Sequence, residues 1–224
     1  IFILMVSGGL LFFFQDSFIK PEVNPKSIAV LPFDNFSPNP EDDYLSAGFT
    51  EVIIANLAKV EDLMVISRTS IMRYKDKDMN LKEIADELQV ANILEGSIQR
   101  TGNKIRVVGQ LIEAKTDNHL WSETYDKDID DIFLIQTSIA KEIASSLKSK
   151  ITESEKSHIE DKLTDNIEAY ELYLKVRELR NVANYYEHNN TLRLSLLEKI
   201  INLDPHFSEA YALLSKEHSE MVHF

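Results

Sequence analysis

Polar residues follow two short apolar runs of this sequence, and their types could bind a ligand. They are Asp34 and Asn35 after the first run, and Arg68, Thr69 and Ser70 after the second. Neighbouring strands of an open α/β sheet deliver such residues to one edge, where ligands tend to bind. A guanidinium can clamp a carboxylate while hydroxyl groups orient it. We therefore predict a binding site at these five positions; the alternative is that Asp34 and Arg68 pair with each other or cap helices.

The other reactive residue types show no catalytic or metal-binding spacing. The sequence has no cysteine, and its six histidines do not form a ligand pattern such as HExxH. It contains neither a glycine-rich phosphate loop nor a GxSxG elbow. The acidic groups at 41–43 and 128–131 are more typical of helix starts than of a cation site. We expect no catalytic residue, no metal and no cofactor in this chain.

Length and composition indicate a folded chain that does not bind nucleic acid. The 224 residues are 44% apolar and 27% charged, which suffices for one large or two small cores. The formal net charge is -13. The phosphate backbone of a nucleic acid is also negative, so it repels a chain of this charge.

The first fourteen residues predict the C-terminal part of a transmembrane helix. Residues 1–14 are apolar and uncharged, and a complete span takes about 20 such residues. Because the chain opens with Ile1 rather than Met, we expect it to be a fragment. A signal peptide is the alternative, but its basic start and small-residue cleavage site are missing. Residues 15–26 contain two prolines and are expected to form an extended linker.

Apolar periodicity predicts an α/β domain over residues 27–151. The order is βαβαβββα, with helices covering one face of a mixed sheet. The predicted strands are 28–33, 63–66, 91–100, 104–114 and 119–125, and the predicted helices are 39–57, 81–88 and 132–151. Residues 152–165 are polar and predict a linker or the exposed end of the preceding helix, and only helical patterns follow over 166–224. The fold class is therefore α+β, followed by an all-α region.

Four motifs lie within the predicted α/β domain. They are AVLPF (29–33), GFTE (48–51), LEGS (94–97) and HLW…YD…DIF (119–133). Together they resemble the TolB amino-terminal-like (FlgO-like) domain of bacteria, and the resemblance covers 27–151. That domain commonly sits between a membrane helix and tetratricopeptide repeats, and it is not known as an enzyme. The resemblance therefore implies a non-enzymatic domain outside the cytoplasm.

The region 166–224 contains one short pattern twice. AYELYL at 169–174 corresponds to AYALLS at 210–215, and NLDP at 202–205 precedes the second copy. The pattern resembles a tetratricopeptide repeat, although the copies are 41 residues apart, rather than about 34. We expect the extra residues around 184–190. A helical hairpin cannot bury its apolar face alone, so the array is expected to continue past Phe224.

These observations favour a non-catalytic binding module. We expect a sensor or scaffold anchored in the inner membrane by a single span, with residues from 20 onward in the periplasm. It would bind a protein or peptide partner and relay a signal inward. The resemblance also implies an output domain before the membrane helix, such as a cyclase, a winged-helix regulator or a kinase. The alternative is thus the receptor half of a class III adenylate or guanylate cyclase. A homodimer is compatible with either function.

Overall fold

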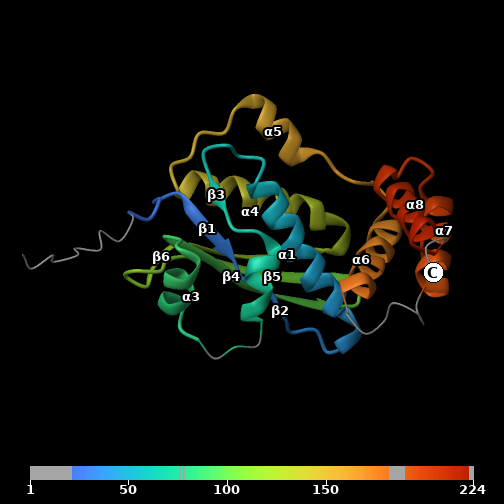
Figure 1. The fold of residues 1–224 in the computed structure, drawn as a ribbon, viewed down its shortest axis with the longest axis horizontal. Coiled ribbons are helices and arrows are strands. Elements are labelled where there is room, and N and C mark those ends of the chain that lie inside the picture. The colour runs from blue at the N-terminus through green and yellow to red at the C-terminus, as the bar shows by residue number, and fades with distance from the viewer. Residues whose placement is uncertain (1–21, 76, 78, 182–189, 222–224) are drawn as a thin grey trace, which may run out of the picture.

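The sheet at the centre of the molecule is mixed, and helices pack on it (Figure 1). The computed structural model describes residues 22–75, 77, 79–181 and 190–221. The sheet has six strands in the order β3-β1-β4-β5-β6, with β2 also paired to β4. The predicted α+β class is confirmed. The predicted membrane segment 1–14, and 184–189 within the expected insertion, lie outside the described residues.

Every predicted strand is present, and β2 is additional. The strands are β1 (Ser27–Val30), β2 (Asp34–Asn35), β3 (Met64–Val65), β4 (Asn92–Thr101), β5 (Lys104–Glu113) and β6 (Asn118–Asp128). The first three run parallel to their partners, whereas β4, β5 and β6 form an antiparallel meander. Gly102 has a φ of 59°. That left-handed conformation allows the tight turn of the predicted hairpin.

Helices connect the parallel strands and fill the second half of the chain. They are α1 (Asp43–Leu57), α2 (Arg68–Ile71), α3 (Leu81–Leu88), α4 (Ile132–Ser146), α5 (Glu153–Glu160), α6 (Ile167–Asn181), α7 (Asn190–Leu203) and α8 (Ser208–Met221). Asn39 caps the 3₁₀ turn before α1, where its side chain accepts a 3.1 Å hydrogen bond from the Glu41 amide.

Two differences from the predicted helices have local causes. Helix α4 ends before residue 151 because Lys148 has a φ of 52°, which a right-handed helix cannot continue. The predicted linker 152–165 contains α5, whose first turn is fixed by a reciprocal capping box between Thr152 and Glu155.

The two faces of the sheet differ in what covers them. Helices α1 and α4 pack on one face, where Leu94, Ile98 and Leu111 are buried. The indole Nε1 of Trp121 on β6 donates a 2.8 Å hydrogen bond to Glu142 of α4 on this face. Helix α3 packs against β4, but Gln110 and other residues of the opposite face stay only half-buried. The second face is therefore partly open.

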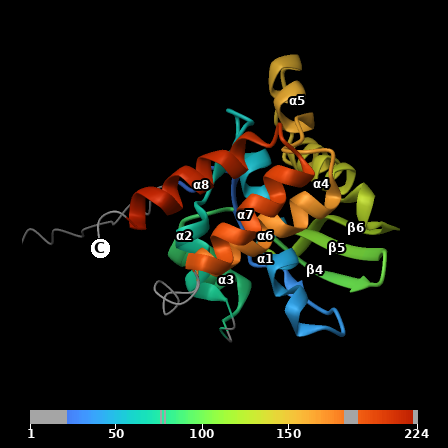
Figure 2. The same cartoon turned by 90° about the vertical axis from the view of Figure 1, so that its right-hand side faces the viewer.

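Helix α6 packs directly on α1, as Figure 2 shows. Tyr170 is fully buried there. Its hydroxyl accepts a 3.0 Å hydrogen bond from Gln136 of α4, and its ring centroid lies 4.6 Å from that of Phe133. The cluster of buried apolar residues is continuous from the sheet into α6 and α7. The predicted ranges 27–151 and 166–224 thus share one hydrophobic core.

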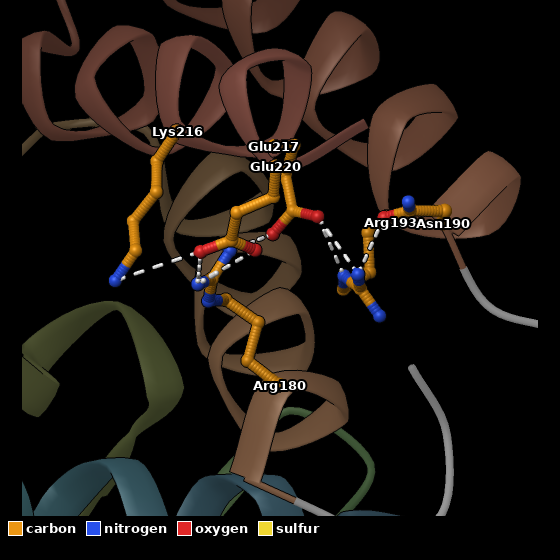
Figure 3. Close-up of polar contacts among 6 residues, drawn as sticks. All are labelled: Arg180, Asn190, Arg193, Lys216, Glu217 and Glu220. Carbon is orange, nitrogen blue, oxygen red and sulfur yellow. Dashed lines mark hydrogen bonds and ion pairs between the residues drawn. The ribbon is translucent and has the colours of Figure 1, made fainter. Parts of the chain in front are cut away.

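A buried network of charges joins the last three helices (Figure 3). Glu217 of α8 is fully buried and lies between Arg180 of α6 and Arg193 of α7. Arg193 donates two hydrogen bonds to it, of 3.0 Å and 2.8 Å. Arg180 also contacts Glu220 at 3.0 Å. Because buried charges need partners, this network specifies how the three helices fit together.

Candidate binding hollow beside the first strand

A hollow of about 750 Å³ opens beside the carboxyl end of β1. Four parts of the chain line it: residues 31–36 after β1, the first turn of α1, residues 74–84 up to the start of α3, and the middle of β4 and β5. The hollow exists because α3 covers only part of the second face of the sheet. It lies where residue types and topology predict a ligand site in an α/β sheet.

The predicted residues Asp34 and Asn35 both line this hollow. Asp34 pairs with Ser97 of β4 and is exposed. Asn35 is held in place, because its Nδ2 donates a 2.7 Å hydrogen bond to the Asp43 carboxylate and its Oδ1 accepts one of 2.9 Å from the Ser37 amide. The first half of the predicted site is therefore part of a preformed wall.

The other three predicted residues lie elsewhere. Arg68, Thr69 and Ser70 form the start of α2 and do not line the hollow. The Arg68 Nε lies 3.8 Å from a carboxylate oxygen of Glu51 on α1, and Ser70 Oγ lies 3.2 Å from the Ser67 Oγ. Asp34 and Arg68 do not form an ion pair, because the Arg68 side chain points to Glu51 of α1.

Glu95 is the lining residue with the most unusual electrostatics. Burial raises the pKa of its carboxyl above the ordinary value; His119 opposes this change, and the negative charges of Asp34 and Asp117 add to it. Within the described residues, neither Glu95 nor Asp34 makes a side-chain hydrogen bond or ion pair. Both carboxylates are therefore available to a ligand, and a perturbed carboxyl in a cleft is a typical sign of a functional site.

The remaining lining is mixed in chemistry. Lys75 and Lys77 supply positive charge, Ser97 and Gln110 supply hydrogen-bonding groups, and apolar side chains such as Leu81 complete the lining. Such a surface can hold a ligand that has both polar and apolar parts. The sequence analysis missed Glu95, although the signal was present, since it is a single charge inside the apolar part of a predicted strand.

A second cavity lies between the sheet domain and the last helices. Its volume is about 270 Å³, and α1, α4, α5 and α6 contribute residues to it. Glu51 and Arg177, which form an ion pair across α1 and α6, are among these residues. This cavity belongs to the contact between the two parts of the chain.

The described residues contain neither a metal-ligand cluster nor a membrane-spanning helix. In this part of the chain, no group of three or more His, Cys, Asp or Glu side chains could hold a metal ion. No helix within the same ranges is long and apolar enough to cross a membrane.

Comparison with known proteins gives one related sequence and several similar folds. The chain is 39% identical over 189 residues to a protein of Rhizobium meliloti (strain 1021) named "Putative adenylate cyclase 3". The match covers 84% of this chain and 32% of the relative, so the chain spans about a third of that protein's length.

Two solved structures are similar to this fold. One is TolB from Acinetobacter baumannii, which is 16% identical over 54% of this chain and 28% of that chain, with a TM-score of 0.41. The other is the lipoprotein GNA1162 from Neisseria meningitidis, which is 17% identical over 55% of this chain and 99% of that chain, with a TM-score of 0.42.

The sequence also matches a described protein family. The match runs over residues 24–142, which is more than half of the chain and includes the whole sheet. The chain therefore belongs to the family described as "HilA/YgeH-like transcriptional regulator, second domain".

Proposed function

We propose that this chain is the non-catalytic sensor or scaffold part of a membrane-anchored signalling protein. It binds a protein or peptide partner in the hollow beside β1, and it relays that binding to an output domain elsewhere in the natural protein. Asp34, Asn35 and Glu95 contact the partner, whereas Arg68 contributes to the packing of α2 on α1.

The hollow is the observation that carries this proposal. It combines a volume of about 750 Å³ with two carboxylates that have no side-chain partner among the described residues. Of the two, Glu95 is half-buried, and a buried carboxylate without a hydrogen bond or ion pair costs stability. Sites kept at a cost in stability are typical of function. The exposed Phe36, on the same wall, offers an apolar anchor for a partner.

The anchoring parts of the proposal come from the sequence. Residues 1–14 would be the end of a single inner-membrane span, 15–26 a linker, and 27 onward would lie in the periplasm. The range 27–151 would be a TolB amino-terminal-like domain and 166–224 the first tetratricopeptide repeats. The three consecutive helices α6, α7 and α8 support this last assignment.

A second candidate function is favoured by the curated relative. Because a protein named as an adenylate cyclase shares 39% identity with this chain, the output domain could be a class III cyclase, with this chain as its receptor half. The chain itself would remain non-catalytic under both candidates. They differ in what the rest of the natural protein does.

A capture experiment with matched variants tests the binding proposal. The chain, extended to the natural ends of its gene, is immobilised and exposed to solubilised envelope proteins, and bound partners are identified by mass spectrometry. Asp34→Lys reverses a charge in the hollow. Glu123→Lys makes the same charge change at an exposed position of β6 outside the hollow.

We expect one partner to bind the wild type and the Glu123→Lys variant but not the Asp34→Lys variant. Equal capture by all three proteins would contradict binding in the hollow. Cyclic AMP formation by the complete protein then separates the two candidates, since only the receptor half of a cyclase predicts that the Asp34→Lys variant changes this activity.

A further inference from the structure

Arg100, at the end of β4, connects the sheet to the last helices. Its Nη1 forms an ion pair with Glu171 of α6 and contacts the Tyr44 hydroxyl of α1 at 3.2 Å. Its Nε donates a 3.1 Å hydrogen bond to the Gly102 carbonyl. The side chains of Arg100 and Glu171 are 22% and 19% exposed, so solvent weakens their attraction less than at an open surface. One guanidinium therefore holds a strand, α1 and α6 together.

The backbone of the same residue is bonded to Ser37, which directly follows the lining residues Asn35 and Phe36. The Arg100 amide donates a 3.0 Å hydrogen bond to the Ser37 hydroxyl, and the Phe36 amide donates one of 2.7 Å to the Ile98 carbonyl. Asn35 is tied to Asp43 at the start of α1. The segment 35–37 is thus hydrogen-bonded to β4 and to α1, the two elements that Arg100 also contacts.

The start of α1 completes the connection. Asp43 lines the hollow. The hydroxyl of the next residue, Tyr44, accepts a hydrogen bond from Arg100, and the Lys175 Nζ of α6 lies 4.8 Å from the centroid of the Tyr44 ring. Tyr44, which follows a residue that lines the hollow, therefore contacts both Arg100 and α6.

We propose that Arg100 is a latch that couples the hollow wall to the docking of α6. An ordered segment 35–37 fixes the backbone of Arg100, the guanidinium then holds Glu171, and each contact stabilises the other. A partner that orders or displaces this wall thereby changes how firmly α6 is held on α1. The coupling is a property of the contacts alone; its use in signalling rests on the proposed function.

The chemistry explains why the latch residue is arginine. The planar fork of a guanidinium reaches the Gly102 carbonyl, Tyr44 and Glu171 together, whereas the single ammonium of lysine cannot satisfy three acceptors in that arrangement. Helix α6 keeps its buried Tyr170 contacts and its Glu51–Arg177 ion pair without the latch. Breaking the latch is therefore expected to loosen α6 without unfolding it.

Amide hydrogen exchange of the complete protein in detergent micelles tests the latch without any ligand. Glu171→Gln removes the charge that Arg100 holds. We expect exchange of the Phe36 and Ser37 amides to become about fivefold faster, although residue 171 touches neither. Reciprocally, Ser37→Ala is expected to speed exchange in α6 by a similar factor.

Glu168→Gln is the matched control, because it removes a charge from the same helix but breaks only the exposed Lys199–Glu168 pair. It should leave exchange at 36 and 37 unchanged. Tyr44→Phe, which removes only a hydroxyl, covers the case in which Glu171→Gln does not fold. Unchanged exchange at 36 and 37 in both latch variants would overturn the proposal. Because no partner is present, that result would leave binding in the hollow unaffected.

Discussion

At the scale of single residues, Glu95 lines the hollow at a cost in folding stability. Its carboxyl is half-buried, and within the described residues it makes no side-chain hydrogen bond or ion pair, although His119 partly offsets the cost of its charge. Its pKa is raised mainly by burial, and Asp34 and Asp117 contribute in the same direction. Because the folded state binds this proton more tightly than the unfolded chain does, the residue destabilises the fold once pH rises through the folded pKa.

Glu95→Gln is therefore expected to raise the free energy of unfolding at about pH 7. The gain should shrink toward about pH 3, well below the ordinary pKa of glutamate, where the carboxyl is protonated in both states. Urea unfolding at the two pH values measures the difference. Glu123→Gln, at an exposed position of β6, should change stability by less than about 0.5 kcal/mol at either pH. A loss of stability at neutral pH in the Glu95→Gln variant would contradict this account.

Glu217 is the opposite case, a buried charge with full compensation. Glu217→Gln leaves the guanidinium of Arg193, which is 3% exposed, without a counter-charge. Removing one partner of a buried pair costs about 3–5 kcal/mol, and we expect thermal unfolding to show a loss of that size. Breaking the exposed pair with Glu168→Gln should cost less than about 1 kcal/mol. Similar losses in the two variants would mean that the Glu217 network does not stabilise the packing of α6, α7 and α8.

The sequence located only half of the candidate site, and the reason is physical. The rule that polar residues after strands meet at one edge identified Asp34 and Asn35, because β1 continues through a short loop into β2. It could not foresee that the chain turns into α2 after β3 and directs Arg68 to Glu51. Such a side-chain partner is set by tertiary packing, which strand periodicity does not record.

At the scale of elements, α1 is the helix on which both parts of the chain depend. Its first turn lines the hollow, one face packs on the sheet, and another face receives α6. At Gly48 the helices approach so closely that an added Cβ would lie 2.6 Å from the Leu174 Cδ2. A side chain at this position would force the buried Leu174 side chain to shift, which explains a glycine within the helix.

Substitution of Leu174 tests how much the contact between α1 and α6 contributes to stability. It is 2% exposed in the shared core, so Leu174→Ala is expected to cost about 2–5 kcal/mol and to loosen α6. Leu192→Ala removes the same atoms from a side chain on α7 that is 45% exposed, and it should cost less than about 0.5 kcal/mol. Denaturant melts of both variants compare the two sites. Equal losses would show that α6 is not part of the common core.

Elements with strong local signals were predictable, and those set by long-range contacts were not. The hairpin of β4 and β5 follows from alternation and its glycine turn, and α3 from the helical spacing of its apolar residues. Residues 152–165 seemed too polar for structure, yet the capping box at Thr152 starts α5, and Ile159 anchors it in the core. The docking of α6 on α1 had no sequence signal, because either helix could have packed on another neighbour.

At the scale of the whole molecule, the net charge of -13 limits what a member of a regulator family can do through this region. Phosphate backbones attract positive surfaces, so we expect no saturable binding to duplex DNA at about 50 mM salt. Fluorescence anisotropy with a labelled duplex provides the measurement. Saturable binding would show that this part of the protein contacts DNA itself, rather than controlling a separate output domain.

The central claim is that a partner binds in the hollow beside β1, and site-specific photo-crosslinking in the complete protein tests it most directly. Phe36 and Leu134 are similarly exposed, at 63% and 60%, but only Phe36 lines the hollow. A photoreactive phenylalanine analogue placed at either position reports on nearby proteins in native membranes. We predict one discrete adduct from position 36, lost in the Asp34→Lys background, and none from position 134. Adducts from position 134 alone, or equally from both positions, would contradict the claim.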